Sequence, residues 1–155
     1  MTGRQLSLAF AGVLLGGMVA LAADDPFTGT WKLNAAKSKI GAGAPTNSTV
    51  IYAPAGDSMK VTVDVVDGSG KPSHNEWTGK FDGKDYPVTG DSQADTRAYT
   101  KVNNRTLTTT GKKGGKVVSS GKIVVSADGK SRTVTNEITT SDGKKVTSTA
   151  VFDKQ

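Results

Sequence analysis

The fold is decided by residues 116–152, which read KVVSSGKIVVSADGKSRTVTNEITTSDGKKVTSTAVF. This stretch contains three runs rich in Val, Ile and Thr, and two Asp-Gly pairs, Asp128-Gly129 and Asp142-Gly143, separate the runs. Asp-Gly pairs favour tight β-hairpin turns because both residues tolerate positive φ. The stretch therefore predicts three antiparallel strands joined by two hairpins, near 116–126, 131–140 and 144–153.

The same alternation of strand-like runs and short polar turns covers the rest of the chain after residue 23. It predicts seven more strands, near 28–33, 47–53, 58–66, 73–81, 84–89, 95–102 and 105–111. Short connections favour pairing of sequential strands, and closing such a meander removes its exposed edges. We therefore predict an all-β, up-and-down antiparallel β-barrel of about 8–10 strands. A β-sandwich is the alternative; it needs longer connections, and only 35–46 and 87–94 are long enough.

Alternation along the strands indicates which side chains point inward. In 58–66 one face carries Met59, Val61, Val63 and Val65. In the last three strands the corresponding faces carry Val117, Ser119, Gly121, Ile123 and Val125, then Val134, Asn136 and Ile138, then Val146, Ser148, Ala150 and Phe152. Many of these residues are small or polar, so they fill a barrel poorly. The sequence leaves two interpretations open: a barrel with an interior cavity, or a flattened barrel whose walls meet.

The N-terminal segment has the pattern of an export signal. Arg4 precedes an uncharged stretch over 5–23, and Ala20-Leu21-Ala22 supplies small residues at a cleavage site. A membrane anchor is the alternative, but this stretch is short and rich in Gly for a spanning helix. We expect residues 1–22 to be a signal peptide and 23–155 to form one domain, exported to the periplasm or the extracellular space, with no membrane span in the mature chain.

Composition narrows the classes of function. The 155-residue chain has no Cys, which excludes disulfides and thiol catalysis. Without Arg4, 19 Lys and Arg face 14 Asp and Glu, so the formal charge of the mature chain is +5. The basic residues are scattered, with pairs only at Lys112-Lys113 and Lys144-Lys145. A nucleic-acid-binding face normally clusters them. We expect a monomer without a nucleic-acid partner.

Two motifs at the ends of the domain resemble the calycin superfamily, meaning lipocalins and fatty-acid-binding proteins. Both families begin with Gly-x-Trp, here Gly29-Thr30-Trp31, and the ending over 149–154, TAVFDK, is similar to that of fatty-acid-binding proteins. The stretch over 29–40 also looks like small exported bacterial proteins described as lipocalin-like. The resemblance implies a structural role for Gly29 and Trp31 at the bottom of the barrel.

Several departures from these families matter for function. The Arg and Tyr that clamp a carboxylate in fatty-acid-binding proteins fall on Ala150 and Phe152 here, and 35–46 is too short for their helical lid. No Arg follows Arg132, so we expect the lipocalin arrangement of an Arg stacked on the Trp to be missing.

Residues with catalytic chemistry are few. His74 is the only imidazole, and its neighbour Ser73 points to the opposite face of a strand, so the two cannot act together. Asp82 and Asp85 flank a tight turn, which explains them without catalysis. No spacing indicates a metal site. We expect neither catalysis nor a cofactor.

Ligand-binding candidates come from the predicted inward faces. Trp77 and Phe81 share strand parity and line the barrel mouth or form a core pair. Arg97 and Tyr99 share a face and orient a ligand if that face points inward, which parity alone does not decide. The remaining candidates are apolar or small: Ile123, Ile138, Ala150 and Phe152.

The sequence supports an exported, non-catalytic protein that binds a small apolar or weakly polar molecule inside its barrel. The alternative is an envelope-associated interaction protein with a filled barrel, whose Lys-bearing turns contact anionic polymers.

Overall fold

The structure is a computed structural model that describes residues 25–41, 47–140 and 142–155. The predicted signal peptide lies outside these residues. The described part contains ten strands: β1 (Gly29–Lys39), β2 (Asn47–Ala55), β3 (Ser58–Val66), β4 (Pro72–Gly79), β5 (Tyr86–Thr89), β6 (Thr96–Asn103), β7 (Thr106–Lys113), β8 (Lys116–Val125), β9 (Ser131–Thr139) and β10 (Lys145–Lys154). A search of the same residues finds no helix with the length and apolar character needed to cross a membrane.

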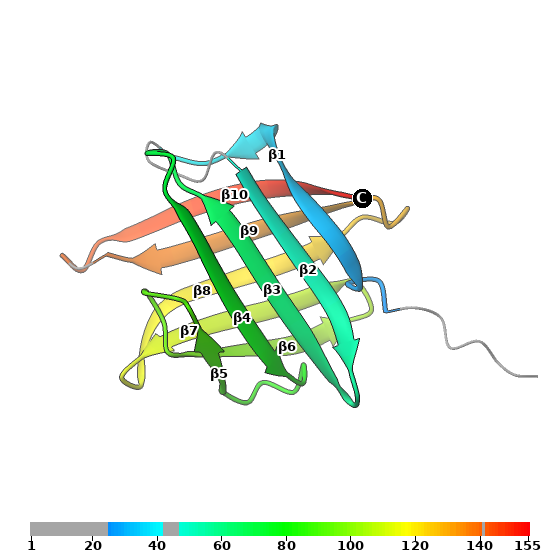
Figure 1. Ribbon diagram of the computed structural model, residues 1–155, viewed down its shortest axis with the longest axis horizontal. Coiled ribbons are helices and arrows are strands. Elements are labelled where there is room, and N and C mark those ends of the chain that lie inside the picture. Colours follow the sequence, from blue (N-terminus) through cyan, green and yellow to red (C-terminus); the bar gives the residue numbers. More distant parts are fainter. Residues whose placement is uncertain (1–24, 42–46, 141) are drawn as a thin grey trace, which may run out of the picture.

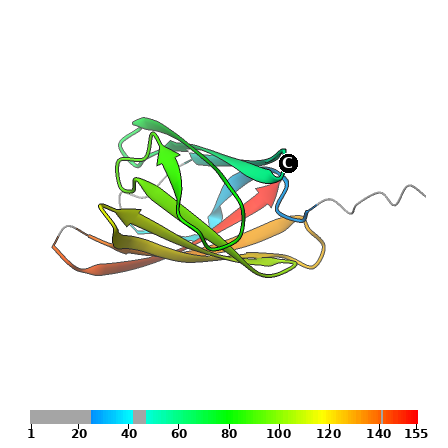
Figure 2. The same cartoon turned by 90° about the horizontal axis from the view of Figure 1, so that it is seen from below.

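The strands form one closed antiparallel barrel, which confirms the predicted fold class and rules out the sandwich. Each strand pairs with the next along the chain, and β10 returns to pair with β1, with Trp31 opposite Lys154. In Figure 1, β2, β3 and β4 cross in front of the wall made by β6 to β10. Figure 2 shows the two walls from below, separated along the barrel. Closure gives each of the ten strands in the described residues a partner on both sides.

The first strand is longer than the sequence predicts. Its apolar alternation ends at Leu33, but β1 continues to Lys39, through part of the expected loop over 35–46. The register against β10 shifts between Asn34 and Lys39, as in a β-bulge. Ser38 accounts for the pairing there, because its Oγ accepts a hydrogen bond from the Val151 amide at 2.9 Å and donates one to the Asn34 carbonyl at 2.7 Å.

A second irregularity reverses the predicted orientation of Val117. The β7–β8 register shifts at Gly111 and Lys112, which pair with Ser119 and Val117, so Val118 has no partner. Val117 is consequently 54% exposed, while Val118 packs against the core. A single bulge residue shifts the alternation by one, and the two-residue period of the sequence does not reveal where this happens.

One end of the barrel is closed around Trp31, which is completely buried. Its indole N–H donates to the Phe27 carbonyl at 2.9 Å, so the segment before β1 folds under the barrel. Gly29 has φ of 125°, and a Cβ there would lie 2.8 Å from Cε of Lys154, which itself reaches over the Trp31 ring. The φ of residue 29 favours Gly because residues with a Cβ rarely adopt it, whereas the flexible end of Lys154 could move aside.

The expectation that no Arg stacks on Trp31 is wrong, because Arg132 itself does so. Its guanidinium carbon lies 5.0 Å from the centre of the Trp31 ring. The register explains the contact: Phe152 pairs with Arg132 across β9–β10 and with Leu33 across β1–β10. Barrel closure thus places Arg132 beside a residue about a hundred positions earlier in the chain.

Large aromatic side chains fill one part of the barrel. Trp77 and Phe81 stack with ring centres 6.3 Å apart, and Tyr99 lies 4.6 Å from Trp77. Tyr86 and Tyr52 add edge contacts to the same cluster. The walls formed by β7 to β10 contribute smaller side chains, so the core is unevenly distributed.

Replacing Trp31 by Ala should lower the free energy of unfolding by about 3–5 kcal/mol, the usual effect of truncating a buried Trp. Urea denaturation followed by circular dichroism measures it. The exposed control Val117→Ala should change stability by less than about 0.5 kcal/mol. Equal effects of the two substitutions would contradict the role of Trp31 in closing the barrel.

Candidate functional site

The barrel interior contains a cavity of about 320 Å³. One wall follows β9 along its length, where Arg132, Val134, Asn136 and Ile138 all face the cavity. Arg132 is 2% exposed and marks the closed end, whereas Ile138 is 38% exposed and marks the end open to solvent. The other lining residues come from several strands and the 90–95 segment: Ser48, Val50, Tyr52, Val63, Asp91, Gln93, Ala94, Arg97, Tyr99, Thr109, Gly111, Val118, Ser119, Ile123 and Phe152.

The cavity exists because the β7 and β8 walls carry small residues where a filled barrel needs large ones. Gly111 faces Ser119, and a Cβ on Gly111 would lie 2.4 Å from the Ser119 hydroxyl. Gly121 lies beside Thr109 and Asn136 in the same way. These short side chains reach each other across strands but not across the barrel. The interpretation of a barrel with an interior cavity is therefore the correct one.

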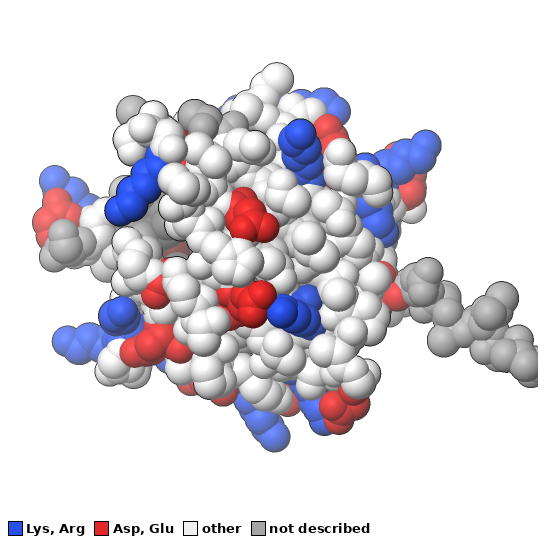
Figure 3. All heavy atoms as spheres, viewed as in Figure 1, with Lys and Arg blue, Asp and Glu red and all other residues white. Residues whose placement is uncertain are grey.

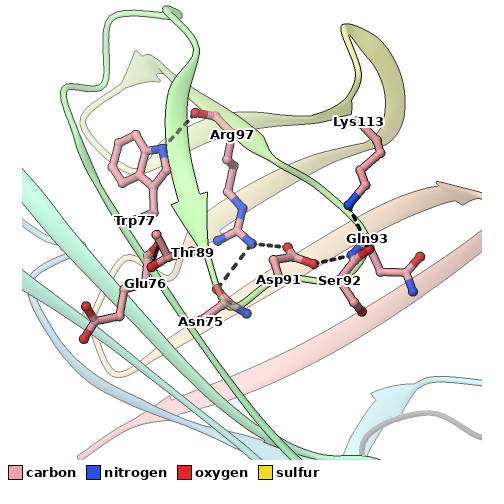
Figure 4. A network of polar contacts seen from close by, with 9 residues as sticks. All are labelled: Asn75, Glu76, Trp77, Thr89, Asp91, Ser92, Gln93, Arg97 and Lys113. Carbon is pink, nitrogen blue, oxygen red and sulfur yellow. Dashed lines mark hydrogen bonds and ion pairs between the residues drawn. The ribbon is translucent and has the colours of Figure 1, made fainter.

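The open end is bordered by an ion pair that fixes the 90–95 segment. Arg97 Nη2 lies 2.9 Å from Asp91 Oδ2 and 3.4 Å from Asn75 Oδ1, and both ionic side chains are largely buried (Figure 4). The Trp77 indole N–H donates to the Arg97 carbonyl at 2.8 Å, which anchors this part of β6 to the aromatic cluster. The pair therefore holds its segment firmly over the end of the cavity.

Electrostatics keep Arg97 in its charged form. Burial by itself lowers the pKa of Arg97, but Tyr99 and Asp91 more than offset this, so the pKa is raised. Asp91 accepts a hydrogen bond from Arg97 in this ion pair. The opposite charges of the two side chains cancel at the open end.

A different situation holds at the closed end, where the Arg132 charge has no acidic partner among the described residues. Three rings surround its guanidinium carbon, with centres 4.9 to 5.0 Å away: Trp31, Tyr52 and Phe152. Its Nε and Nη1 atoms are buried and have no hydrogen-bond partner in the described part of the chain. Cation–π contacts give about 0.5–2 kcal/mol each. Burying a charge costs several kcal/mol, and three such contacts together are of the same order.

The same surroundings also shift the pKa of Tyr52. Burial raises the pKa of its hydroxyl, Tyr99 raises it further and Arg132 opposes both, with a large net increase. Tyr52 is therefore neutral at physiological pH and does not neutralise Arg132.

The structure brings five of the predicted ligand-binding residues to the cavity: Arg97, Tyr99, Ile123, Ile138 and Phe152. Arg97 and Tyr99 thus face inward, which settles the orientation that parity left open. Trp77, Phe81 and Ala150 do not line the cavity. Trp77 and Phe81 are a stacked core pair rather than mouth residues, and Ala150 packs against the core.

Arg132 is the main lining residue that the sequence interpretation missed. It occupies the same face of β9 as Val134, Asn136 and Ile138, which were predicted to point inward. Extending that alternation by one step would have placed an Arg inside the barrel. Tyr52 and Asp91 were also missed, and only the folded arrangement reveals Asp91, which lies in a connection.

Other polar sites lie on the outer surface. A hollow of about 380 Å³ over the ends of β2, β3 and β4 is lined mainly by exposed side chains, including His74, so it encloses a ligand less well than the interior. His74 Nδ1 lies 2.6 Å from Asp64, and its Nε2 lies 3.5 Å from Glu76.

The acidic residues predicted to flank a turn do not form a catalytic pair. Asp82 accepts hydrogen bonds from the Lys84 amide and the Tyr86 hydroxyl, as a turn residue does. In residues 25–41, 47–140 and 142–155, no group of three His or acidic side chains could hold a metal ion.

Comparisons with known proteins give similarity of fold alone. No family model and no curated protein matches the chain. The structure of EF1p2_mFAP2b bound to DFHBI is 12% identical, with 84% of this chain and 94% of that chain covered and a TM-score of 0.47. The redesigned β-barrel b11L5F_LGL is 14% identical, with 84% of this chain and 92% of that chain covered and a TM-score of 0.45. The redesigned β-barrel mFAP1 bound to DFHBI is 17% identical, with 83% of this chain and 95% of that chain covered and a TM-score of 0.45. At these values the similarity carries no information about function.

The fold and the interior therefore define this protein as a closed ten-strand antiparallel β-barrel with an internal cavity.

The His74 cluster gives a prediction for pH dependence. The hydrogen bond to Asp64 is the largest influence and raises the pKa of His74 above its usual 6.5. A raised pKa in the folded state means that this pairing stabilises the fold fully below about pH 6.5 and that the contribution disappears as pH rises through the folded pKa. An NMR titration of this single imidazole should give a pKa above 6.5, and Asp64→Asn should lower it. An unchanged pKa in that variant would show that the pair is not formed.

Proposed function

We propose that this protein is an exported, non-catalytic binding protein that holds a small molecule in the barrel interior. The observation that carries the proposal is the cavity of about 320 Å³, which is enclosed by ordered strands and open at one end. Ligand sites typically have volumes of about 300–1,000 Å³, mostly apolar walls and a few polar groups. This cavity is at the small end of that range and suits a compact ligand.

The lining indicates an apolar ligand body. Val50, Val63, Val118, Ile123 and Val134 provide aliphatic walls, and burial of apolar ligand surface against them contributes about 25 cal/mol per Å². Neutral polar groups on β7 to β9, from Thr109, Ser119 and Asn136, lie along the same cavity. Their hydroxyl and amide groups can both donate and accept hydrogen bonds and so fix the orientation of the ligand.

The reactive side chains that the structure describes already take part in other interactions or are kept neutral. This supports a non-catalytic role. Asp91 and Arg97 bind each other at the open end, and Tyr52 is kept neutral by its high pKa. His74 lies on the outer surface in an ion-pair cluster. None of these groups is placed as an acid–base pair facing a common point in the cavity.

The alternative, binding of anionic polymers by Lys-bearing turns, receives less support. Lys112 pairs with Asp85 at 2.7 Å, Lys144 with Asp142 at 3.2 Å and Lys145 with Glu137 at 2.7 Å. On the face shown in Figure 3, basic and acidic side chains are interspersed. Such a mixed surface gives a weak field for a polyanion.

Filling the cavity should abolish binding of a neutral apolar dye. Ser119 lines the cavity, and Ser120 is exposed on the opposite face of the same strand. We expect the fluorescence of Nile red to rise with the unsubstituted protein and with Ser120→Phe, and to stay low with Ser119→Phe. Circular dichroism checks that both variants fold. Equal dye binding by the two variants, or none by the unsubstituted protein, would argue against an interior site.

Export is the other part of the proposal, and it is supported by the pattern of residues 1–22. Expression of the full chain in a Gram-negative bacterium should release a product into the periplasm whose intact mass corresponds to a chain beginning at Ala23. Arg4→Glu together with Leu14→Arg and Leu15→Arg should keep the full-length chain in the cytoplasm, because charges interrupt the apolar region of the signal. Cytoplasmic accumulation of the unaltered chain at full length would contradict this part.

A further inference from the structure

We propose that the ligand is a small neutral molecule with an amide edge, meaning an N–H donor beside a C=O acceptor as in a lactam, and that Asn136 binds this edge. This inference rests on the proposed function and deepens it, because an apolar or weakly polar ligand needs no such edge.

The Asn136 carboxamide is unpartnered and accessible in the wall of the cavity. Asn136 lines the cavity, and its side chain has no hydrogen-bond partner among the described residues. Its oxygen and nitrogen stay accessible, in contrast to Nε and Nη1 of Arg132, which are buried. A ligand that enters from the open end can therefore reach the carboxamide.

Gly121 leaves space beside this carboxamide. Gly121 pairs with Asn136 across β8–β9 and with Thr109 across β7–β8. A Cβ at Gly121 would lie 3.1 Å from Asn136 Oδ1 and 2.8 Å from Thr109 Oγ1. Polar groups from the two neighbouring strands thus converge above the bare backbone of Gly121. The missing side chain lets a flat ligand approach both of them.

The chemistry of a carboxamide selects an amide edge. The side chain of Asn136 presents an acceptor oxygen and an N–H donor next to each other in one plane. An edge with the complementary donor and acceptor forms two parallel hydrogen bonds with it, as Asn does with the donor–acceptor edge of adenine. A ketone satisfies only the donor. The Thr109 hydroxyl can donate a further bond to the ligand carbonyl, because that oxygen has two lone pairs.

The charges around the cavity favour a neutral ligand. Asp91 and Arg97 neutralise each other at the open end. Nε and Nη1 of Arg132 are buried, and three rings surround its guanidinium carbon. The accessible groups above Gly121 belong to Thr109 and Asn136, which carry no charge. An ion would lose its hydration there without a charged partner, whereas an amide exchanges its water for equivalent hydrogen bonds.

The position of Asn136 specifies the orientation of the ligand. On β9, Asn136 lies two residues from Val134, about 7 Å along the strand in the direction of the closed end. Ile123 pairs with Val134 across β8–β9, and both side chains line the cavity. With its amide edge at Asn136, the ligand places its apolar rings against Ile123 and Val134.

The test compares 2-quinolone and coumarin by isothermal titration calorimetry at pH 7.5. The two probes have the same two-ring shape and the same carbonyl, but a ring oxygen in coumarin replaces the ring N–H of 2-quinolone. One additional hydrogen bond predicts that the unsubstituted protein binds 2-quinolone about 10-fold more tightly. Equal affinities, or tighter binding of coumarin, would overturn the inference and leave the proposed cavity function standing.

Substitutions at neighbouring positions of β9 test the role of Asn136 itself. Asn136→Leu keeps the branched shape without polar atoms and should remove the preference for 2-quinolone. Thr135→Leu introduces the same residue at the adjacent exposed position and should keep the preference. Circular dichroism and Nile red binding check the fold and the cavity. Asn136→Val, which suits a strand, replaces Asn136→Leu if that variant does not fold. An undiminished preference without the carboxamide would show that Asn136 does not select the ligand.

Failure of the proposed function has a different signature. If neither Nile red nor either heterocyclic probe binds the folded protein, the cavity is not a binding site and both proposals fall together. If Nile red binds while the two probes bind equally or not at all, only the amide-edge inference falls.

Discussion

The pairing of β1 with β10 is the constraint on which the rest of the structure depends. It turns a meander of hairpins into a closed barrel, and it brings Trp31, Phe152 and Arg132 together although they come from opposite ends of the domain. The contact between a buried guanidinium and three rings follows directly from this closure. One pairing thus creates both the closed end of the barrel and the aromatic surroundings of Arg132.

The interior combines two kinds of packing. Aromatic rings centred on Trp77 and Tyr99 pack together in one part, and this cluster belongs to the buried core. Across the barrel, Gly111, Ser119 and Asn136 leave space that neighbouring side chains do not reach. A barrel can keep such a cavity because its walls are held by hydrogen bonds around a closed sheet and not only by packing across the centre.

The two Arg residues of the cavity show how similar side chains acquire different roles. Arg97 is matched by Asp91 and serves to fix the connection at the open end. Arg132 is surrounded by aromatic rings and has no carboxylate partner among the described residues, and its Nε and Nη1 are buried there without a hydrogen-bond partner. The difference arises from the partners that the fold supplies, since nothing in either residue's local sequence distinguishes them.

The sequence alone determined the ten strands, the antiparallel meander and most inward faces, because hairpin turns and two-residue alternation are local properties of the chain. It placed Val134, Asn136, Ile138 and Phe152 correctly for that reason. Only the tertiary structure decided the bulge that turns Val117 outward, the extension of β1 to Lys39, and the meeting of Arg132 with Trp31. These features depend on register and closure between distant segments, and local patterns do not encode such relations.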